Sequence, residues 1–213
     1  MKRISFLLSI ILFFIAANAQ SELKPVSDAD LVAIKNAIRE KNTQIKTIIC
    51  PFVQTKKMEM LKENMVSKGI MYFKKATQFR WEYTGENPFV FVQNGEKYYK
   101  QVNGKVVEVK DNSTRMFQEM SKMVIASMNG EIFEDTKKFK IDFQENNSMV
   151  VVNLTPIQKG MQNFMSKIKL YFNKNTYLIS KIEIFEKGND TTTILFENVK
   201  VNQMVNDSLF ELK

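Results

Sequence analysis

The chain has 213 residues, of which 31 are lysine or arginine and 23 are aspartate or glutamate, so its formal net charge is +8. It contains no histidine and a single cysteine. These counts exclude Ser-His-Asp and Cys-His catalytic arrangements, HExxH zinc sites and an intramolecular disulfide. The carboxylates are dispersed without the spacing of a calcium loop, so we expect no metal site. An enzyme is the less favoured class, although a catalytic pair of carboxylates brought together by the fold is left open.

Residues 1–19 have the pattern of a secretory signal peptide. Lys2 and Arg3 precede an apolar run at residues 4–16, and residues 17–19 form an A-x-A cleavage site. We expect cleavage after Ala19 and an exported, soluble protein formed by residues 20–213 as one domain. That mature chain keeps a net charge of +6, because the leader carries two basic residues and no acidic one. Its lysines are scattered and form no nucleic-acid motif, so we expect no nucleic-acid partner.

The first predicted helix covers residues 27–42. Ser27 can cap it, Asp30 follows three residues later, and apolar residues recur at helical spacing after them. Strand patterns then continue from residue 48 to residue 110. Within them, Asn94-Gly95 and Asn103-Gly104 predict two type I′ hairpin turns, so this region is an antiparallel meander.

The hydrophobic period changes to that of a helix over residues 114–128. Met116, Met120, Met123 and Val124 share one face, and Asn129-Gly130 can end the helix. Strand patterns return afterwards at residues 139–144, 149–155, 166–172, 177–186, 191–201 and 208–212. Between them, residues 156–165 break the alternation and predict a loop or a short helical turn.

Large apolar side chains alternate with charged ones along residues 67–83. Phe79, Trp81 and Tyr83 share one face of a strand, and Met71 and Phe73 share one face of the strand before it. A sheet of about ten strands must be closed, stacked or covered. Helices rich in methionine over its concave face would form an apolar cavity that adapts to flexible acyl chains. Alternatively, the methionines are ordinary core residues.

Over nearly its whole mature length, the chain resembles the periplasmic outer-membrane lipoprotein carrier (LolA) family. The resemblance rests on the first helix, on FVQT at 52–55, on SKGIMYFKKATQFRWEY at 67–83, on FVFVQNGEKYY at 89–99 and on DSLFEL at 207–212. It implies an α+β fold, a single-domain unclosed antiparallel half-barrel of about eleven strands with helices over its concave face. It also implies a carrier, without catalysis or cofactor, that shuttles lipoproteins from the inner to the outer membrane.

The resemblance also implies partners and a binding surface. The partners would be acylated lipoproteins, an inner-membrane ABC-type release complex and an outer-membrane acceptor, and we expect the carrier itself to be a monomer. Ile48 and Cys50 would share the interior, with Cys50 a small buried hydrophobic residue. The expected lipid-binding cavity is lined by Phe52, Met71, Phe73, Phe79, Trp81, Tyr83, Met116, Met120 and Met123.

Lys75 lies where members of the family often carry an arginine that resembles a latch for the helical lid. A lysine has one compact donor in place of a planar fork, so a latch at Lys75 would be built differently. A solvated lysine at a strand end is the alternative. For the whole protein, the alternatives are a carrier or sensor of another amphiphile, such as a glycolipid or an acylated precursor, and a lipid hydrolase, which the absence of histidine disfavours.

Overall fold

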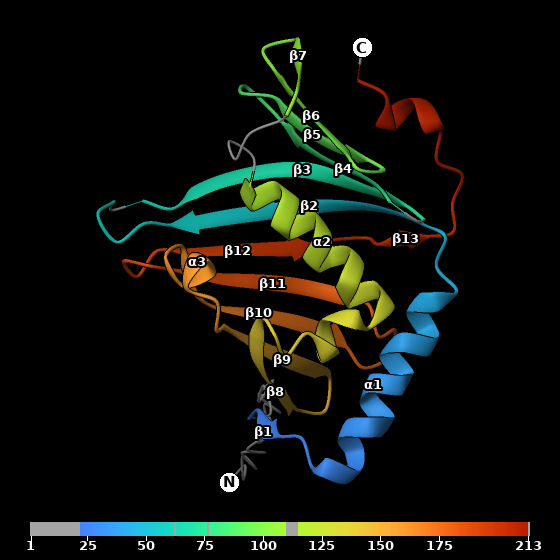
Figure 1. Cartoon of the computed structure of the whole chain (residues 1–213), viewed down its shortest axis with the longest axis vertical. Coiled ribbons are helices and arrows are strands. Elements are labelled where there is room, and N and C mark those ends of the chain that lie inside the picture. The colour runs from blue at the N-terminus through green and yellow to red at the C-terminus, as the bar shows by residue number, and fades with distance from the viewer. Residues whose placement is uncertain (1–21, 62, 76, 110–114, 213) are drawn as a thin grey trace, which may run out of the picture.

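The computed structural model describes residues 22–61, 63–75, 77–109 and 115–212. Within these ranges a 13-stranded antiparallel sheet forms most of the protein, and helices lie over one of its faces (Figure 1). The strands are β1 (Lys24–Pro25), β2 (Thr47–Lys57), β3 (Met65–Lys74), β4 (Gln78–Thr84), β5 (Phe89–Asn94), β6 (Lys97–Val102), β7 (Lys105–Glu108), β8 (Phe139–Glu145), β9 (Met149–Pro156), β10 (Met165–Asn173), β11 (Ile179–Glu186), β12 (Thr191–Phe196) and β13 (Lys200–Val201).

The helices are fewer and, apart from two, short. They are α1 (Asp28–Thr43), α2 (Arg115–Asn129), α3 (Lys159–Gln162) and the 3₁₀ turns η2 (Glu131–Glu134) and η3 (Asp207–Phe210). The hydroxyl of Ser27 caps α1 by accepting a hydrogen bond from the backbone N–H of Asp30 at 3.2 Å. Gly130 follows α2 with a φ of 73°, the left-handed conformation that ends helices. Both predicted helices are therefore confirmed to within one residue at each end.

The sheet consists of two meanders that meet at one pair of strands. Its order is β1-β8-β9-β10-β11-β12-β2-β3-β4-β5-β6-β7, and β13 adds a second partner to β2. β12 and β2 pair in register from Thr191 opposite Lys57 to Phe196 opposite Phe52. The first and last strands of this order do not pair with each other, so the sheet is open. The predicted unclosed antiparallel half-barrel is confirmed, with two of its 13 strands only two residues long.

Alternation along the strands gives the sheet two different faces. On β4, Phe79 and Trp81 are fully buried on the face that the helices cover, which we call the inner face. The intervening side chains of Arg80 and Glu82 lie on the opposite, outer face and pair with each other at 2.7 Å. The inner face forms the main hydrophobic core together with α1, α2 and η2.

The C-terminal segment packs on the outer face of β4 and β5. Phe210 is fully buried there against Val90 and Val92, and the guanidinium of Arg80 donates to the carbonyl of Leu209 at 3.0 Å. The strand predicted at residues 208–212 is wrong, because this segment forms η3. The side chain of Asn206 caps that turn. The strands beneath it, β4 and β5, already pair with a strand on each edge, so the C-terminal segment has no free edge of theirs to join.

One of the two predicted hairpin turns is displaced by a residue. Asn103 and Gly104 have φ values of 49° and 77°, as a type I′ turn requires, so that turn is confirmed. In the other hairpin Asn94 remains in β5, opposite Lys97, and the turn is Gly95-Glu96. The Asn94 side chain donates to the carbonyl of Phe210 at 3.2 Å, which holds this residue in the strand.

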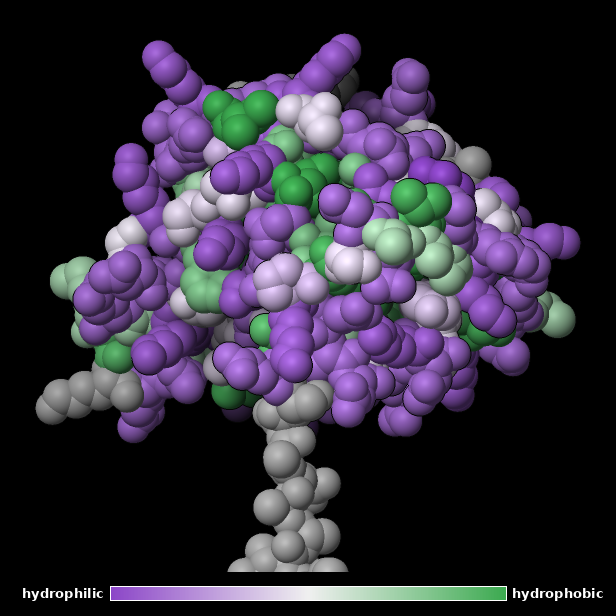
Figure 2. Space-filling model, turned by 90° about the horizontal axis from the view of Figure 1, so that it is seen from below, coloured by the Kyte–Doolittle hydropathy of each residue, from purple (hydrophilic) through white to green (hydrophobic). Residues whose placement is uncertain are grey.

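The surface seen in Figure 2 is largely hydrophilic, with hydrophobic side chains in small separate groups. No helix among the described residues is long and apolar enough to cross a membrane.

Candidate functional site

The helix α2 lies across the inner face of the sheet, with its first turn over β3 and its other end near α1 (Figure 1). The side chains of Met123 and Val124, both in α2, are buried between this helix and the sheet. Its last turn leads through Gly130 into η2, whose Ile132 and Phe133 are also buried. α2 is therefore held between the sheet and a firmly packed turn at its C-terminal end.

The α1 helix fixes that turn. Glu134 of η2 accepts from Lys35 at 3.3 Å and lies 3.8 Å from the guanidinium of Arg39. Arg39 also lies against Gly130, where an added Cβ would be 3.3 Å from Nε. Between the fixed turn and the helix stands a single residue with positive φ, so a movement of α2 away from the sheet would pivot at Gly130.

A buried polar contact crosses the apolar interface between α2 and the sheet. The hydroxyl of Ser121 donates to Oε1 of Gln93 on β5 at 2.9 Å, and the carbonyl of Gln118 lies at the same distance. Both Ser121 and Gln93 are buried. A hydrogen bond in such surroundings is costly to break without a new partner, so it favours the position in which α2 covers the sheet.

Aromatic rings form a continuous run through the interior beneath and beside α2. The rings of Phe52 and Trp81 stack at 3.9 Å, and Tyr83 meets Phe52 edge-on at 5.5 Å. Gly69 makes this stack possible, because a Cβ there would lie 2.3 Å from the Phe52 ring. From α2, Phe117 reaches the same run and packs against Phe89 at 4.9 Å.

Tyr83 marks the polar end of the aromatic run. Its hydroxyl donates to Oε1 of Gln54 at 2.7 Å. Burial raises the pKa of Tyr83. The indole N–H of Trp81, next to it in the aromatic run, meets no acceptor at hydrogen-bonding geometry among the described residues. A buried donor without an acceptor is uncommon in a folded protein.

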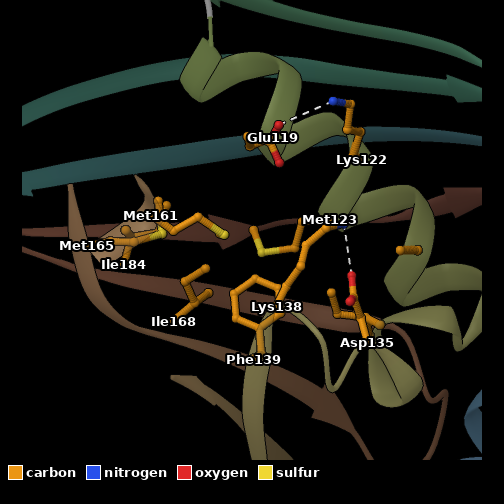
Figure 3. A pocket seen from close by; sticks show the side chains of 12 residues that line it. Glu119, Lys122, Met123, Asp135, Lys138, Phe139, Met161, Met165, Ile168 and Ile184 are labelled. Atoms are coloured by element: carbon orange, nitrogen blue, oxygen red, sulfur yellow. Dashed lines mark hydrogen bonds and ion pairs between the residues drawn. The ribbon is translucent and has the colours of Figure 1, made fainter. Parts of the chain in front are cut away.

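Two small cavities flank α2. The first has a volume of about 80 Å³ and is lined by Met123, Met161, Met165, Phe139, Ile168 and Ile184. Figure 3 shows Met123 and Met161 facing each other across it from α2 and from the segment around α3. Two ion pairs stand at its rim, Glu119–Lys122 at 3.2 Å and Asp135–Lys138 at 2.9 Å.

The second cavity is smaller, about 30 Å³, and lies between α2 and strands near the β2–β12 pair, where Met71 and Val124 line it. Sites for drug-sized ligands usually measure about 300–1,000 Å³. Neither cavity beside α2 can therefore hold a long acyl chain while α2 covers the sheet.

A third, open groove of about 730 Å³ lies beyond the N-terminal end of α2. Ends of β2, β3, β4 and β5 form it together with the β4–β5 loop and Phe117. It combines apolar side chains (Val66, Tyr83, Phe89, Phe117) with polar ones (Gln54, Ser67, Lys68, Thr84, Glu86, Asn87).

The side chains expected to line a cavity lie on the inner face, though most are packed in the core. Phe52, Met71, Phe73, Phe79 and Trp81 are each at most 4% exposed. Ile48 and Cys50 are buried with them.

Of the other four expected members, two border open space and two have side chains outside the described ones. Tyr83 lines the open groove, and Met123 lines the cavity in Figure 3. The side chains of Met116 and Met120 lie outside the described ones.

Lys75 is exposed just beyond β3, where it contacts the end of α1. Its backbone N–H donates to the carbonyl of Lys46 at 2.8 Å, and its Nζ donates to the carbonyl of Thr43 at 3.3 Å. The contact therefore joins the β3–β4 turn to the last turn of α1, where a cation interacts favourably with free helix carbonyls.

Several residues of this region could not be assigned from the sequence pattern. Met161 and Met165 lie in or next to a segment that breaks the strand alternation, and their approach to Met123 depends on the tertiary fold. The signal for Ser121 and Gln93 is weak but present: each is a polar residue on an otherwise apolar face.

The thiol of Cys50 is buried, and burial raises its pKa to about 12. It is therefore protonated at neutral pH and unsuited to nucleophilic chemistry. Among the described residues, no group of three or more cysteine, aspartate or glutamate side chains is arranged to hold a metal ion.

Comparison with known proteins gives a family and a set of distant structures. The family model described as outer membrane lipoprotein carrier protein LolA matches residues 43–213. Among curated proteins, none matches the chain in sequence.

Solved structures with a similar course of the chain have low sequence identity. A DUF1329 family protein from Desulfovibrio piger is 11% identical, with a TM-score of 0.48 over 85% of this chain and 97% of that one. A putative outer membrane lipoprotein-sorting protein domain from Vibrio parahaemolyticus is 9% identical, with a TM-score of 0.47 over 84% and 95%. The lipoprotein LppX from Mycobacterium tuberculosis is 12% identical, with a TM-score of 0.47 over 84% and 99%.

Proposed function

Because this chain belongs to the outer membrane lipoprotein carrier (LolA) family, we propose that it is a periplasmic carrier of lipoproteins. It takes up their acyl chains between α2 and the inner face of the sheet and shuttles them from the inner to the outer membrane. The mature carrier is residues 20–213, released by cleavage after Ala19. It receives its cargo from an ABC-type release complex, passes it to an outer-membrane acceptor, and catalyses no reaction.

The observation that carries this proposal is the way α2 covers the sheet. An apolar helix face with Met123 and Val124 lies over a methionine-lined cavity, beside an aromatic run and next to a one-residue pivot. Displacing α2 would merge the two small cavities beside it into one apolar space. Methionine side chains adapt to the shape of a flexible chain better than branched ones do.

The energetics suit a shuttle. Burying a methylene group contributes about 0.8 kcal/mol, so complete burial of several long acyl chains would make release very slow. Here the ligand must first displace α2, which loses its contacts with the sheet and the Ser121–Gln93 hydrogen bond. That loss offsets part of the gain, so transfer to a site that buries the chains more completely can proceed without ATP.

Two polar contacts are proposed to stabilise the closed, ligand-free state. One is the buried Ser121–Gln93 bond between α2 and β5, and the other is the exposed contact from Lys75 to Thr43 at the end of α1. Loss of either would make closure less favourable. Because closure expels the ligand, the expected effect is slower release with uptake preserved.

A loading assay tests the proposal. Purified protein is incubated with liposomes that contain a fluorescent triacylated lipopeptide, and the liposomes are then sedimented. We expect lipopeptide in the supernatant only with the protein present. Met123→Gln places a polar group in the cavity and should lower this loading about tenfold, equivalent to 1.4 kcal/mol.

The control is Met204→Gln, which makes the same change at a side chain that is 96% exposed. It should load as the unaltered protein does, and circular dichroism checks that both variants are folded. If the unaltered protein extracts no lipopeptide, the proposed function is wrong. If the protein extracts another amphiphile from a lipid mixture and extracts no lipopeptide, that amphiphile is its cargo and lipoproteins are not.

A further inference from the structure

The open groove beyond the N-terminal end of α2 differs from the two cavities in size and chemistry. Its volume of about 730 Å³ lies within the range of ligand sites, whereas the cavities of about 80 and 30 Å³ do not. We infer that this groove is the entrance through which an acyl ester passes, chain first, and that the Phe117 ring separates it from the interior. The inference rests on the proposed function and adds a route to it.

Phe117 is placed between the groove and the buried aromatic run. Its ring packs 4.9 Å from Phe89 and 5.5 Å from Phe91, and lies 6.4 Å from Tyr83. Tyr83 in turn touches Phe52, which stacks on Trp81 in the core. Apolar surface is therefore continuous from the groove to the core, and Phe117 is the part of it that α2 carries.

The composition of the groove fits one kind of occupant. Val66, Phe89 and Phe117 contribute apolar surface to its lining, and Gln54, Ser67 and Asn87 contribute hydrogen-bonding groups. An acyl ester combines the same two kinds of group, a hydrocarbon chain joined to a carbonyl and a polar head. The chain can follow the aromatic surface inward while its ester and head stay beside the polar side chains.

The alternative route, through the cavity in Figure 3, is less suitable. That cavity is bordered by the Glu119–Lys122 and Asp135–Lys138 ion pairs, which a hydrocarbon chain would have to pass and partly desolvate. From the groove, the ring contacts of Phe117 with Tyr83 and Phe89 lead towards the core, so a chain can enter along aromatic surface.

A site-directed block tests the route. Ser67→Cys places a thiol in the groove, and reaction with a polyethylene-glycol maleimide fills the space in front of it. Ser208→Cys is the matched control, an exposed serine in η3 on the outer face. Cys50 does not interfere, because it is buried and its pKa is raised to about 12. Binding of the methyl ester of parinaric acid is followed by stopped-flow fluorescence.

We expect labelled Ser67→Cys to bind the probe at least about tenfold more slowly than unlabelled protein, a barrier change of 1.36 kcal/mol. Labelled Ser208→Cys should bind at the unaltered rate. Phe117→Ala should raise the association and dissociation rate constants by similar factors, because it opens the passage in both directions. A residue that only contacts bound ligand would change dissociation alone.

The outcomes separate the two proposals. If the unlabelled protein binds no probe, the proposed function and the route fall together. If it binds the probe and neither the Ser67 label nor Phe117→Ala alters association, the carrier function stands and this entrance is wrong. The labelling experiment gives a result even if Phe117→Ala does not fold. Ser67 is only half-buried, so we expect Ser67→Cys to fold.

Discussion

Cys50 is a buried thiol that is chemically silent in the folded protein. Burial raises its pKa to about 12, so near pH 8 the folded thiol is protonated, whereas the same thiol in an unfolded chain has a pKa near 8.5. We predict that Ellman's reagent at pH 8 reacts with Cys50 at a rate limited by unfolding, and rapidly in denaturant. Rapid reaction of the native protein would contradict the packing described for β2.

The Ser121–Gln93 bond allows a matched test on a single helix. Ser121→Ala leaves Oε1 of Gln93 buried without its donor, and we expect the free energy of unfolding to fall by about 1–2 kcal/mol. If ligand binding already breaks this bond, the same change should raise the affinity for an acyl probe by up to about tenfold. Urea unfolding and probe titration measure the two effects.

Ser127→Ala is the control for that variant. Ser127 is equally buried in α2, but its hydroxyl donates to the carbonyl of Met123 within the helix, at 2.6 Å. Ser127 also lines the second cavity, but its hydroxyl makes no contact with β5, so its removal should change the probe affinity less than Ser121→Ala does. Equal affinities for all three proteins would mean that α2 keeps its contact with β5 when ligand is bound.

At the scale of the elements, the hydrogen bond that joins α1 to the β3–β4 turn leads to a prediction about delivery of lipoprotein to the acceptor membrane. Lys75→Leu removes the hydrogen bond to Thr43 and leaves the inner face unchanged. We expect normal loading, and delivery to acceptor membranes slower by about two- to fivefold, as loss of 0.5–1 kcal/mol of closure energy implies. A two-step assay measures loading and delivery separately.

The neighbouring Lys74→Leu is the control, since Lys74 pairs with Asp207 on the outer face. It should affect neither step. Normal delivery by Lys75→Leu would show that this lysine has no part in release, and would leave Ser121–Gln93 as the contact that favours closure.

The elements themselves were largely predictable because their local signals agree. Ser27 gives α1 its start, Gly130 gives α2 its end, and alternation marks Phe79 and Trp81 as inner-face residues. The C-terminal turn was missed because a short apolar segment can form either a strand or a turn packed on the outer face, and the choice depends on which sheet edges are already paired. The site was predicted less completely, since the approach of Met161 to Met123 and of Ser121 to Gln93 arises only from the tertiary fold.

At the scale of the whole molecule, the two meanders carry different parts of the proposed machinery. The meander β2–β7 supplies most of the aromatic run and of the open groove, and the meander β8–β12 supplies Phe139, Met161, Met165, Ile168 and Ile184 of the methionine-lined cavity. α2 spans both, and it is the segment of chain that connects them (Figure 1). In the proposed mechanism, a displacement of this one helix would open a path from the groove of one meander to the cavity of the other.

The junction of β2 with β12 also determines how the protein reaches its fold. β3 can pair with β2 early, because it follows directly in the chain, but the other edge of β2 is completed only by residues 191–196 and 200–201. Pairings between segments so distant in sequence form slowly, and an unpaired strand edge promotes aggregation. In the export proposed above, N-terminus first, this edge of β2 would stay unpaired until nearly all of the chain has crossed the membrane, and the folding yield should depend on chaperones during that interval.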